Sequence, residues 1–268
     1  MGEELLIQQV KLLRKDHPRM GVRKLYIKLQ PFMQAHDIKL GRDGLFDLLS
    51  AYNLLIRKRK RRIRTTQSRH SLQQYPNQVK DLLVTGPNQL WVSDITYWPL
   101  SDKYCYISLI TDAYARKIVG YQLGASLATV ESIKALRMAL SGLAGQRGPT
   151  KLLHHSDRGV QYCSQAYSQL LEKHPITISM ASAGEPLENA LAERVNGLIK
   201  EAYLAHDRST SLQAAKLKLA QVVKLYHEAS PPMSLGNYTP EQVDQAKVNI
   251  GCKRLWKHYY QEKLSPVK

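Results

Sequence analysis

Cysteine is scarce in this chain of 268 residues, which contains only Cys105, Cys163 and Cys252. The three are far apart, their number is odd, and no C-x-x-C pair occurs. A disulfide framework is therefore excluded, and a structural zinc site is disfavoured. We expect three small, partly buried thiols in a protein of a reducing compartment.

Long hydrophobic runs are also missing. No apolar stretch approaches the roughly 18 residues of a membrane span. Glu3 and Glu4 stand where a secretory signal would carry basic and then apolar residues. A Gly-rich Walker loop for ATP is absent as well, and there is no internal repeat. We therefore expect a cytoplasmic protein without a membrane partner.

Positive charge is what the chain has in excess. Its 39 Lys and Arg against 22 Asp and Glu give a net charge of +17 and a pI of about 9.8. Such a surplus attracts a polyanion, most often through phosphate groups. The run RKRKRRIR at 57–64 has seven basic residues in eight and favours phosphate backbones. A solvated linker is the alternative interpretation of this run.

The chain divides into four segments by pattern. Apolar residues recur at helical spacing in three short runs before residue 56, which suits a small helical DNA-binding bundle or a helical cap on a larger domain. A basic, polar linker follows to about Gly86-Pro87. We therefore expect a helical DNA-binding segment at 1–56, a basic linker at 57–87, a catalytic core at 88–230 and a basic C-terminal tail at 231–268.

The core segment has the pattern of a mixed α/β fold. Closely spaced β-rich runs at about 90–98, 104–114 and 117–123 predict an antiparallel meander. Alternating helices and strands follow, at about 129–142, 151–156, 164–174 and 176–180. Two long helices are predicted at about 187–204 and 211–228, and TPEQ at 239–242 predicts a capped helix start. This order indicates a mixed sheet flanked by helices.

Three acidic residues are the candidates for chemistry. Asp94 lies within the first strand of the core and Asp157 just after the fourth. If these strands are neighbours, the two carboxylates meet at one sheet edge. Glu193 lies on the helix of 187–204, pointing about 200° away from Leu191 of its apolar stripe. Glu193 shares a polar stripe with Asn189, Asn196 and Lys200. For this helix alone, a solvent-facing stripe would be the simpler interpretation.

Converging carboxylates need a cation or a shared proton, because they repel one another. Hard oxygen ligands suit Mg²⁺ or Mn²⁺, which also take phosphate oxygens as ligands. Two such ions about 3.5–4 Å apart support in-line phosphoryl displacement. The excess positive charge and the three acidic residues therefore both indicate a phosphodiester substrate.

Four motifs in order make the sequence resemble the DDE integrase core, most closely the OrfB-type transposases of bacterial insertion sequences. They are WVSDITYW, YCYISLITDAYARKIVGYQL, HSDRGVQY and GEPLENALAERVNGLIKEAY, spread over about 88–243. The acidic spacing agrees, with 35 residues between the last two acids. A weaker match covers HPRMGVRKLYIKL and RKRKRR in the preceding helical segment.

The resemblance implies an RNase H-like fold and a two-ion Mg²⁺ or Mn²⁺ site formed by Asp94, Asp157 and Glu193. It also implies that Lys200 contacts transposon-end DNA and that Asn189 matches an Asn of the family; we count both as DNA-binding candidates. The other DNA-binding candidates belong to the basic run: Arg57, Lys58, Arg59, Lys60, Arg61 and Arg62. Asp112 also fits the family pattern, and we interpret it as a structural turn cap.

The implied reaction is cleavage of one strand at an element end, followed by transfer of the freed 3′ hydroxyl to another phosphodiester. Its partners would be double-stranded DNA, at the element ends and the target, and at least one further copy of the chain. A helix-turn-helix and leucine-zipper segment from an upstream frame is another expected partner. The protein would be bacterial and nucleoid-associated.

One loop departs from the family pattern, because Ser230 and Pro232 stand where Arg and His are usual. A catalytically silent, transposase-derived DNA-binding protein is therefore an alternative. A plain RNase H-type nuclease is a third, although it has little use for the helical segment. The basic, aromatic tail KRLWKHYYQEKL at 253–264 is expected either to lie along DNA or to form a surface helix.

Overall fold

The computed structural model describes residues 2–56, 71–100, 103–143, 151–182, 185–205, 207, 209–230, 232–245, 250–251 and 253–254. Its N-terminal part is helical, as predicted. The three helices are α1 (Gly2–Asp16), α2 (Val22–Ala35) and α3 (Arg42–Ala51). Their apolar faces bury one another in a small core of their own, which includes Leu6, Leu25 and Leu45. The basic run at 57–64 lies outside the described residues.

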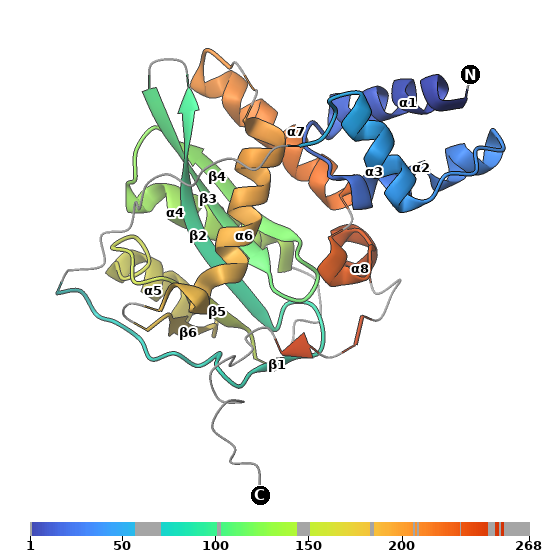
Figure 1. The fold of residues 1–268 in the computed structure, drawn as a ribbon. Helices are drawn as coiled ribbons and strands as arrows, with labels where there is room; N and C mark the ends of the chain where they lie inside the picture. The colour runs from blue at the N-terminus through green and yellow to red at the C-terminus, as the bar shows by residue number, and fades with distance from the viewer. Residues whose placement is uncertain are drawn as a thin grey trace, which may run out of the picture.

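A five-stranded mixed sheet forms the centre of the larger part of the molecule (Figure 1). The strands lie in the order β4-β3-β2-β5-β6. Their bounds are β2 (Leu90–Leu100), β3 (Lys103–Asp112), β4 (Ile118–Gly124), β5 (Leu153–Ser156) and β6 (Thr177–Met180). The first three form the predicted antiparallel meander, and β5 pairs with β2 in parallel. The sheet is thus the mixed α/β sheet that the sequence predicts.

Helices cover both faces of the sheet. One face carries α4 (Thr129–Leu143) and α5 (Gln165–Lys173), which pack against Trp91 and Ile110. The other carries α6 (Ala190–Leu198) and α7 (Leu212–Ala229), which pack against Trp98 and Ile107. The two tryptophans of β2 face opposite ways, because side chains alternate along a strand.

The long helix expected over about 187–204 is divided into three segments, which corrects that prediction. A 3₁₀ turn, η1 (Pro186–Asn189), precedes α6, and a π-helical segment, η2 (Ile199–Leu204), follows it. π-Helical turns are rare in proteins, and those that occur are often found near functional sites. Leu191, Val195 and Leu198 of α6 nevertheless form the predicted apolar stripe against the sheet.

The N-terminal helices contact the core at η2. His17, just after α1, is buried, and its Nδ1 lies 3.2 Å from the hydroxyl of Tyr203. Lys24 at the start of α2 and Ser230 at the end of α7 line the same small cavity of about 140 Å³. The helical segment is therefore in direct contact with the helix that carries Glu193.

The predicted capping box at 239–242 is confirmed at the start of α8 (Pro240–Asp244), where Thr239 and Gln242 cap reciprocally. A two-stranded sheet pairs β1 (Leu83–Val84) with β7 (Lys253–Arg254). The first residues of the tail thus form a strand rather than the surface helix considered above; 255–268 lie outside the described residues.

The boundaries of the catalytic core expected at residues 88 and 230 stay predictions. Val79 and Val84 before the first point, and Leu235 and Val243 after the second, are nevertheless buried in one cluster with Leu90 of the sheet. No helix in the described part of the chain has the length and apolar character to cross a membrane.

Candidate active site

The register between β2 and β5 brings two acidic residues together. Ser93 and Ser156 are the last partners of the parallel pair. Asp94 and Asp157 follow at the next position of each strand, so both carboxylates lie at the same level of the sheet. The structure therefore places the first and fourth strands of the core side by side, as the sequence analysis required.

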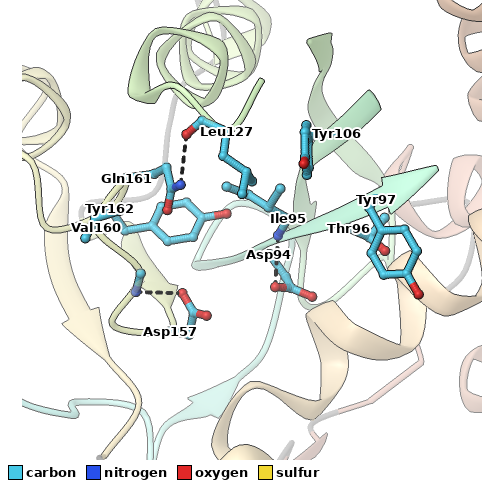
Figure 2. A pocket seen from close by; sticks show the side chains of 11 residues that line it. Asp94, Ile95, Thr96, Tyr97, Tyr106, Leu127, Asp157, Val160, Gln161 and Tyr162 are labelled. Atoms are coloured by element: carbon cyan, nitrogen blue, oxygen red, sulfur yellow. Dashed lines mark hydrogen bonds between the residues drawn. The ribbon is translucent and has the colours of Figure 1, made fainter. Parts of the chain in front are cut away.

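Asp94 and Asp157 line one cavity of about 320 Å³ at this edge (Figure 2). The loop after β5 and the outer half of β2 form most of its wall. The other lining residues are Ile95, Thr96, Tyr97, Tyr106, Leu127, Gly159, Val160, Gln161 and Tyr162. The cavity thus combines two carboxylates with a wall of aromatic, apolar and uncharged polar side chains.

Hydrogen bonds fix the orientation of both carboxylates. Oδ1 of Asp94 accepts from the backbone N–H of Ile95 at 2.9 Å, and Oδ2 accepts from the side-chain amide of Asn196 at 2.8 Å. Oδ1 of Asp157 accepts from the N–H of Gly159 at 3.0 Å. A Cβ at Gly159 would lie only 3.0 Å from that same oxygen, so the tight turn favours glycine there.

The electrostatics of the cavity favour a bound cation. Burial, together with the negative charges of Asp157 and Glu193, raises the pKa of Asp94 to about 7. The donors Asn196 and Ile95 act in the opposite direction and lower this pKa. Two carboxylates that line one cavity provide the hard oxygen ligands that Mg²⁺ and Mn²⁺ prefer. The pair therefore fits a divalent ion.

Glu193 lies near this pair but does not line the cavity. It is exposed on α6, three residues before Asn196, which contacts Asp94 directly. In the described ranges, no three His, Cys, Asp or Glu side chains are grouped as a ready metal site. The structure thus brings two of the three predicted ligands together and places the third on the helix that crosses them.

Part of the polar stripe of α6 is buried against the edge of the sheet, and the rest is exposed to solvent. Asn189 and Asn196 are each 3% exposed. The side-chain amide of Asn189 donates to the carbonyl oxygen of Ser93 at 3.0 Å. Asn189 therefore attaches the start of α6 to β2, and its expected contact with DNA stays a prediction.

Lys200, the other DNA-binding candidate on this stripe, lies in η2. Its Nζ is 3.3 Å from the centroid of the Tyr97 ring, which is a cation–π contact. Desolvation lowers the pKa of this amine. The remaining candidates, Arg57, Lys58, Arg59, Lys60, Arg61 and Arg62, lie outside the described residues.

Asp112 has the structural role predicted for it. Its carboxylate accepts from the N–H of Asn88 at 2.6 Å and from that of Ala115 at 2.7 Å. His154 is buried in β5 between Ser93 and Tyr167, whose hydroxyls lie 2.7 and 2.9 Å from its Nε2. Neither residue lines the acidic cavity.

Sequence reasoning missed two residues of the site. Asn196 was recognised as part of the polar stripe, but its spacing of three residues from Glu193 was not used to place it against Asp94. Tyr162 follows Asp157 by five residues, and its buried hydroxyl has no hydrogen-bond partner among the described residues. A polar group left so close to two carboxylates suits a site that binds a further group.

Known proteins resemble this chain in both sequence and fold. Two families, each described as an integrase core domain, match residues 84–186 and 174–240. The transposase for insertion sequence element IS629 of Shigella sonnei is 32% identical over 234 residues, which cover 87% of this chain and 76% of that protein. The 31 kDa protein of insertion element IS600 from the same organism is 33% identical over 215 residues, or 80% of this chain and 78% of that one.

Among solved structures, one chain of the simian T-cell lymphotropic virus intasome in complex with PP2A regulatory subunit B56 gamma resembles this protein. The matched region covers 94% of this chain and 74% of that chain. The TM-score is 0.50 at 14% identity, so this likeness concerns the fold alone. It agrees with the RNase H-like, mixed five-stranded sheet described above. The chain belongs to the insertion-sequence transposases of the DDE integrase superfamily, and it is a polynucleotidyl transferase of the DDE type.

Proposed function

We propose that this transposase cuts one DNA strand at an end of its element and joins the freed 3′ hydroxyl to a second phosphodiester. Asp94, Asp157 and Glu193 are the catalytic residues and hold two Mg²⁺ or Mn²⁺ ions. The single observation that carries the proposal is the shared cavity of Asp94 and Asp157, which neighbouring parallel strands bring to one level. The contact between Asn196 and Asp94 supports the third ligand, because it holds the helix of Glu193 across this cavity.

When bound, such ions polarise phosphoryl oxygens and lower the pKa of water. In the first step, the oxygen of a water molecule forms a bond to phosphorus, the bond to the 3′ oxygen breaks, and the proton that the water loses is balanced by protonation of the leaving 3′ oxygen to a hydroxyl through solvent. In the second, that 3′ hydroxyl attacks another phosphodiester, and its proton passes to solvent as a new 3′ oxygen leaves. One phosphodiester replaces another in this transfer, so no ATP is consumed.

The residues of the chain contribute orientation to both steps. Ile95, Asn196 and Gly159 fix the two aspartates, so their oxygens need little rearrangement before reaction. Glu193 lies one helical turn from Asn196, which contacts Asp94, and its negative charge already raises the pKa of Asp94. We therefore expect the third ligand to come into place when the cation binds.

The DNA partner in this proposal is double-stranded, at the element ends and at the target. A net charge of +17 supports phosphate binding, with Lys200 beside the site and the run at 57–64 as the main contacts. At least two copies of the chain would act together, because two ends must meet for joining. An upstream-frame helix-turn-helix and leucine-zipper segment would complete the assembly, in association with the bacterial nucleoid.

A substitution at Glu193 tests the proposal. Glu193→Gln keeps the size of the side chain but removes its charge, so joining of labelled oligonucleotides in Mg²⁺ should fall by at least about a hundredfold. DNA affinity should change less than about twofold, because phosphate contacts dominate it. Glu228→Gln, on the exposed side of α7, is the matched control and should join normally. Undiminished joining by Glu193→Gln would disprove the assignment.

The replacement of the usual Arg and His by Ser230 and Pro232 favours a second candidate function. Ser230 is buried beside Tyr203 and His17, where the Arg usual in the family would place a charge. If the loop has lost a required phosphate contact, the protein is a DNA-binding relative without joining activity. Wild-type chain that binds element ends but joins none of them in Mg²⁺ or Mn²⁺ would establish this alternative.

A further inference from the structure

Three tyrosines, one of them exposed and two half-buried, form an aromatic surface on the part of the β2–β3 hairpin next to its turn. Tyr97 is paired with Tyr106 across the two strands, and Pro99 with Tyr104, so the three tyrosine side chains share one face of the sheet. The rings of Tyr97 and Tyr104 are 5.6 Å apart and nearly perpendicular. Tyr104 is 60% exposed, which is unusual for a large ring in a strand. We call Tyr97, Tyr104 and Tyr106 the tyrosine face.

This face is continuous with the acidic cavity. Tyr97 and Tyr106 line that cavity together with Asp94 and Asp157, and in Figure 2 they stand across it from Gln161 and Tyr162. A volume of about 320 Å³ has room for a single nucleobase but not for a duplex. Paired bases in a duplex expose only their edges, so their flat faces cannot reach the rings. An unpaired base can stack on them.

The charges around the tyrosine face suit a single DNA strand. Lys200 lies over Tyr97, and Lys103 is exposed next to Tyr104. Alternation along β3 directs Lys103 to the opposite face of the strand from Tyr104, so Lys200 provides the amine at the rings. A strand could therefore direct a phosphate toward Lys200 and its bases toward the tyrosines. Aromatic rings beside basic groups are the usual composition of sites that bind single-stranded nucleic acid without sequence preference.

We propose that the tyrosine face binds unpaired bases of the DNA strand that leaves the cavity next to the cleaved phosphodiester. The proposal rests on the proposed function in placing DNA at the cavity. It adds that the end of the duplex is opened there, with the separated bases stacked on Tyr104 and its neighbours. Lys200 then holds the backbone of the opened strand.

Photo-cross-linking locates the contact without requiring chemistry. The probe is a 12-nucleotide oligothymidine with one central 5-iodouracil, irradiated with the whole chain in EDTA. Trypsin should release residues 81–103 and 104–116 as separate peptides, because no Lys or Arg lies within either before its last residue. The cross-link should fall on Tyr97 in the first peptide or on Tyr104 or Tyr106 in the second. Cross-links confined to other peptides would overturn the proposal.

Affinity measurements separate stacking from charge. The double variant Tyr97→Leu/Tyr104→Leu should bind the same oligothymidine about tenfold more weakly, while duplex affinity changes less than about twofold. Tyr104→Phe keeps the ring and should bind like wild type. Tyr238→Leu, at a tyrosine that is 42% exposed outside this face, should also bind like wild type.

Other results of these measurements contradict the proposal. An equal loss for oligothymidine and duplex would make the tyrosine face a general contact, and no loss at all would remove its role. If the double variant changes only the oligomeric state, the face is an interface between copies. Because the binding is measured in EDTA, it can succeed or fail independently of the Glu193→Gln joining assay.

Discussion

Asn196 of α6 donates a hydrogen bond of 2.8 Å from its side-chain amide to Oδ2 of Asp94 in β2, across 102 residues of sequence. The contact joins the helix of Glu193 to the strand of the first aspartate. Asn196 is buried, so the bond is shielded from competing water. We interpret Asn196 as a positioning residue that keeps Asp94 oriented and eases its ionisation.

Asn196→Ala should reduce joining most strongly at low pH. The amide donor lowers the pKa of Asp94, so its removal should raise that pKa above its present value of about 7. The acid limb of the joining rate should move to higher pH, and joining at neutral pH should fall by roughly tenfold. Rates measured between about pH 6 and 9 would show whether the activity recovers on the alkaline side. A uniform loss at every pH would instead indicate a purely structural role.

Asn189→Ala should lower stability and leave DNA binding unchanged. The side chain attaches α6 to the carbonyl oxygen of Ser93, and its loss should lower the free energy of unfolding by about 1–3 kcal/mol. Lys200→Ala is the contrasting variant, since it should weaken DNA binding and reduce the salt dependence by about one phosphate contact. Urea denaturation and fluorescence anisotropy at several salt concentrations measure both effects. Weaker DNA binding by a fully folded Asn189→Ala would confirm its expected DNA contact.

Gly120→Ala should destabilise the core. A Cβ on Gly120 of β4 would collide with the carbonyl oxygen of Ala135 in α4 and lie 3.0 Å from the Cβ of Ala139. The backbones would have to separate, and we expect a loss of about 1–3 kcal/mol in the free energy of unfolding. Gly142→Ala is the matched control in α4, because nothing lies within 4 Å of its Cβ. It should be neutral or stabilise the protein by up to about 1 kcal/mol.

Acidification should destabilise the protein through His227. Its Nε2 accepts a 3.0 Å hydrogen bond from the N–H of Ile118, which requires a neutral ring. Burial lowers the pKa of His227 from 6.5 to about 4. Between pH 4 and pH 6.5 the unfolded state binds more protons than the folded state. The stability contributed by the neutral, hydrogen-bonded ring is therefore fully present above pH 6.5 and is lost as the pH falls toward 4.

The buried His17 and His154 should also destabilise the protein on acidification, because burial lowers their pKa values to about 4 and about 3. Burial raises the pKa of Asp94 and Asp112 to about 7, which acts in the opposite direction. His227→Gln should reduce the loss of stability between about pH 7 and 5 by about 1–2 kcal/mol. Thermal unfolding across that range measures the change. An identical pH dependence in wild type and variant would assign the loss to other groups.

Much of this protein followed from sequence pattern alone. The alternation of β2 and the apolar run of β3 fixed a meander, because tight connections leave no other way to pair such strands. The order of strands and helices fixed the mixed sheet. Asp94, within the first predicted strand, and Asp157, just after the fourth, were expected at one sheet edge on the condition that these strands are neighbours, and the parallel pairing of β2 with β5 meets that condition. The capping box at Thr239 was local chemistry and needed no tertiary contact.

Tertiary structure decided the features that depend on contacts between distant segments. Helical periodicity put Asn189, Glu193, Asn196 and Lys200 on one stripe, but periodicity gives only a direction around the axis. The packing of α6 on β2 decided that the two asparagines are buried and that Glu193 is exposed. The division of the predicted helix by η2, the contact of His17 with Tyr203 and the tyrosine face arise in the same way. Each depends on which surfaces the folded chain covers, and a one-dimensional pattern contains no information about that.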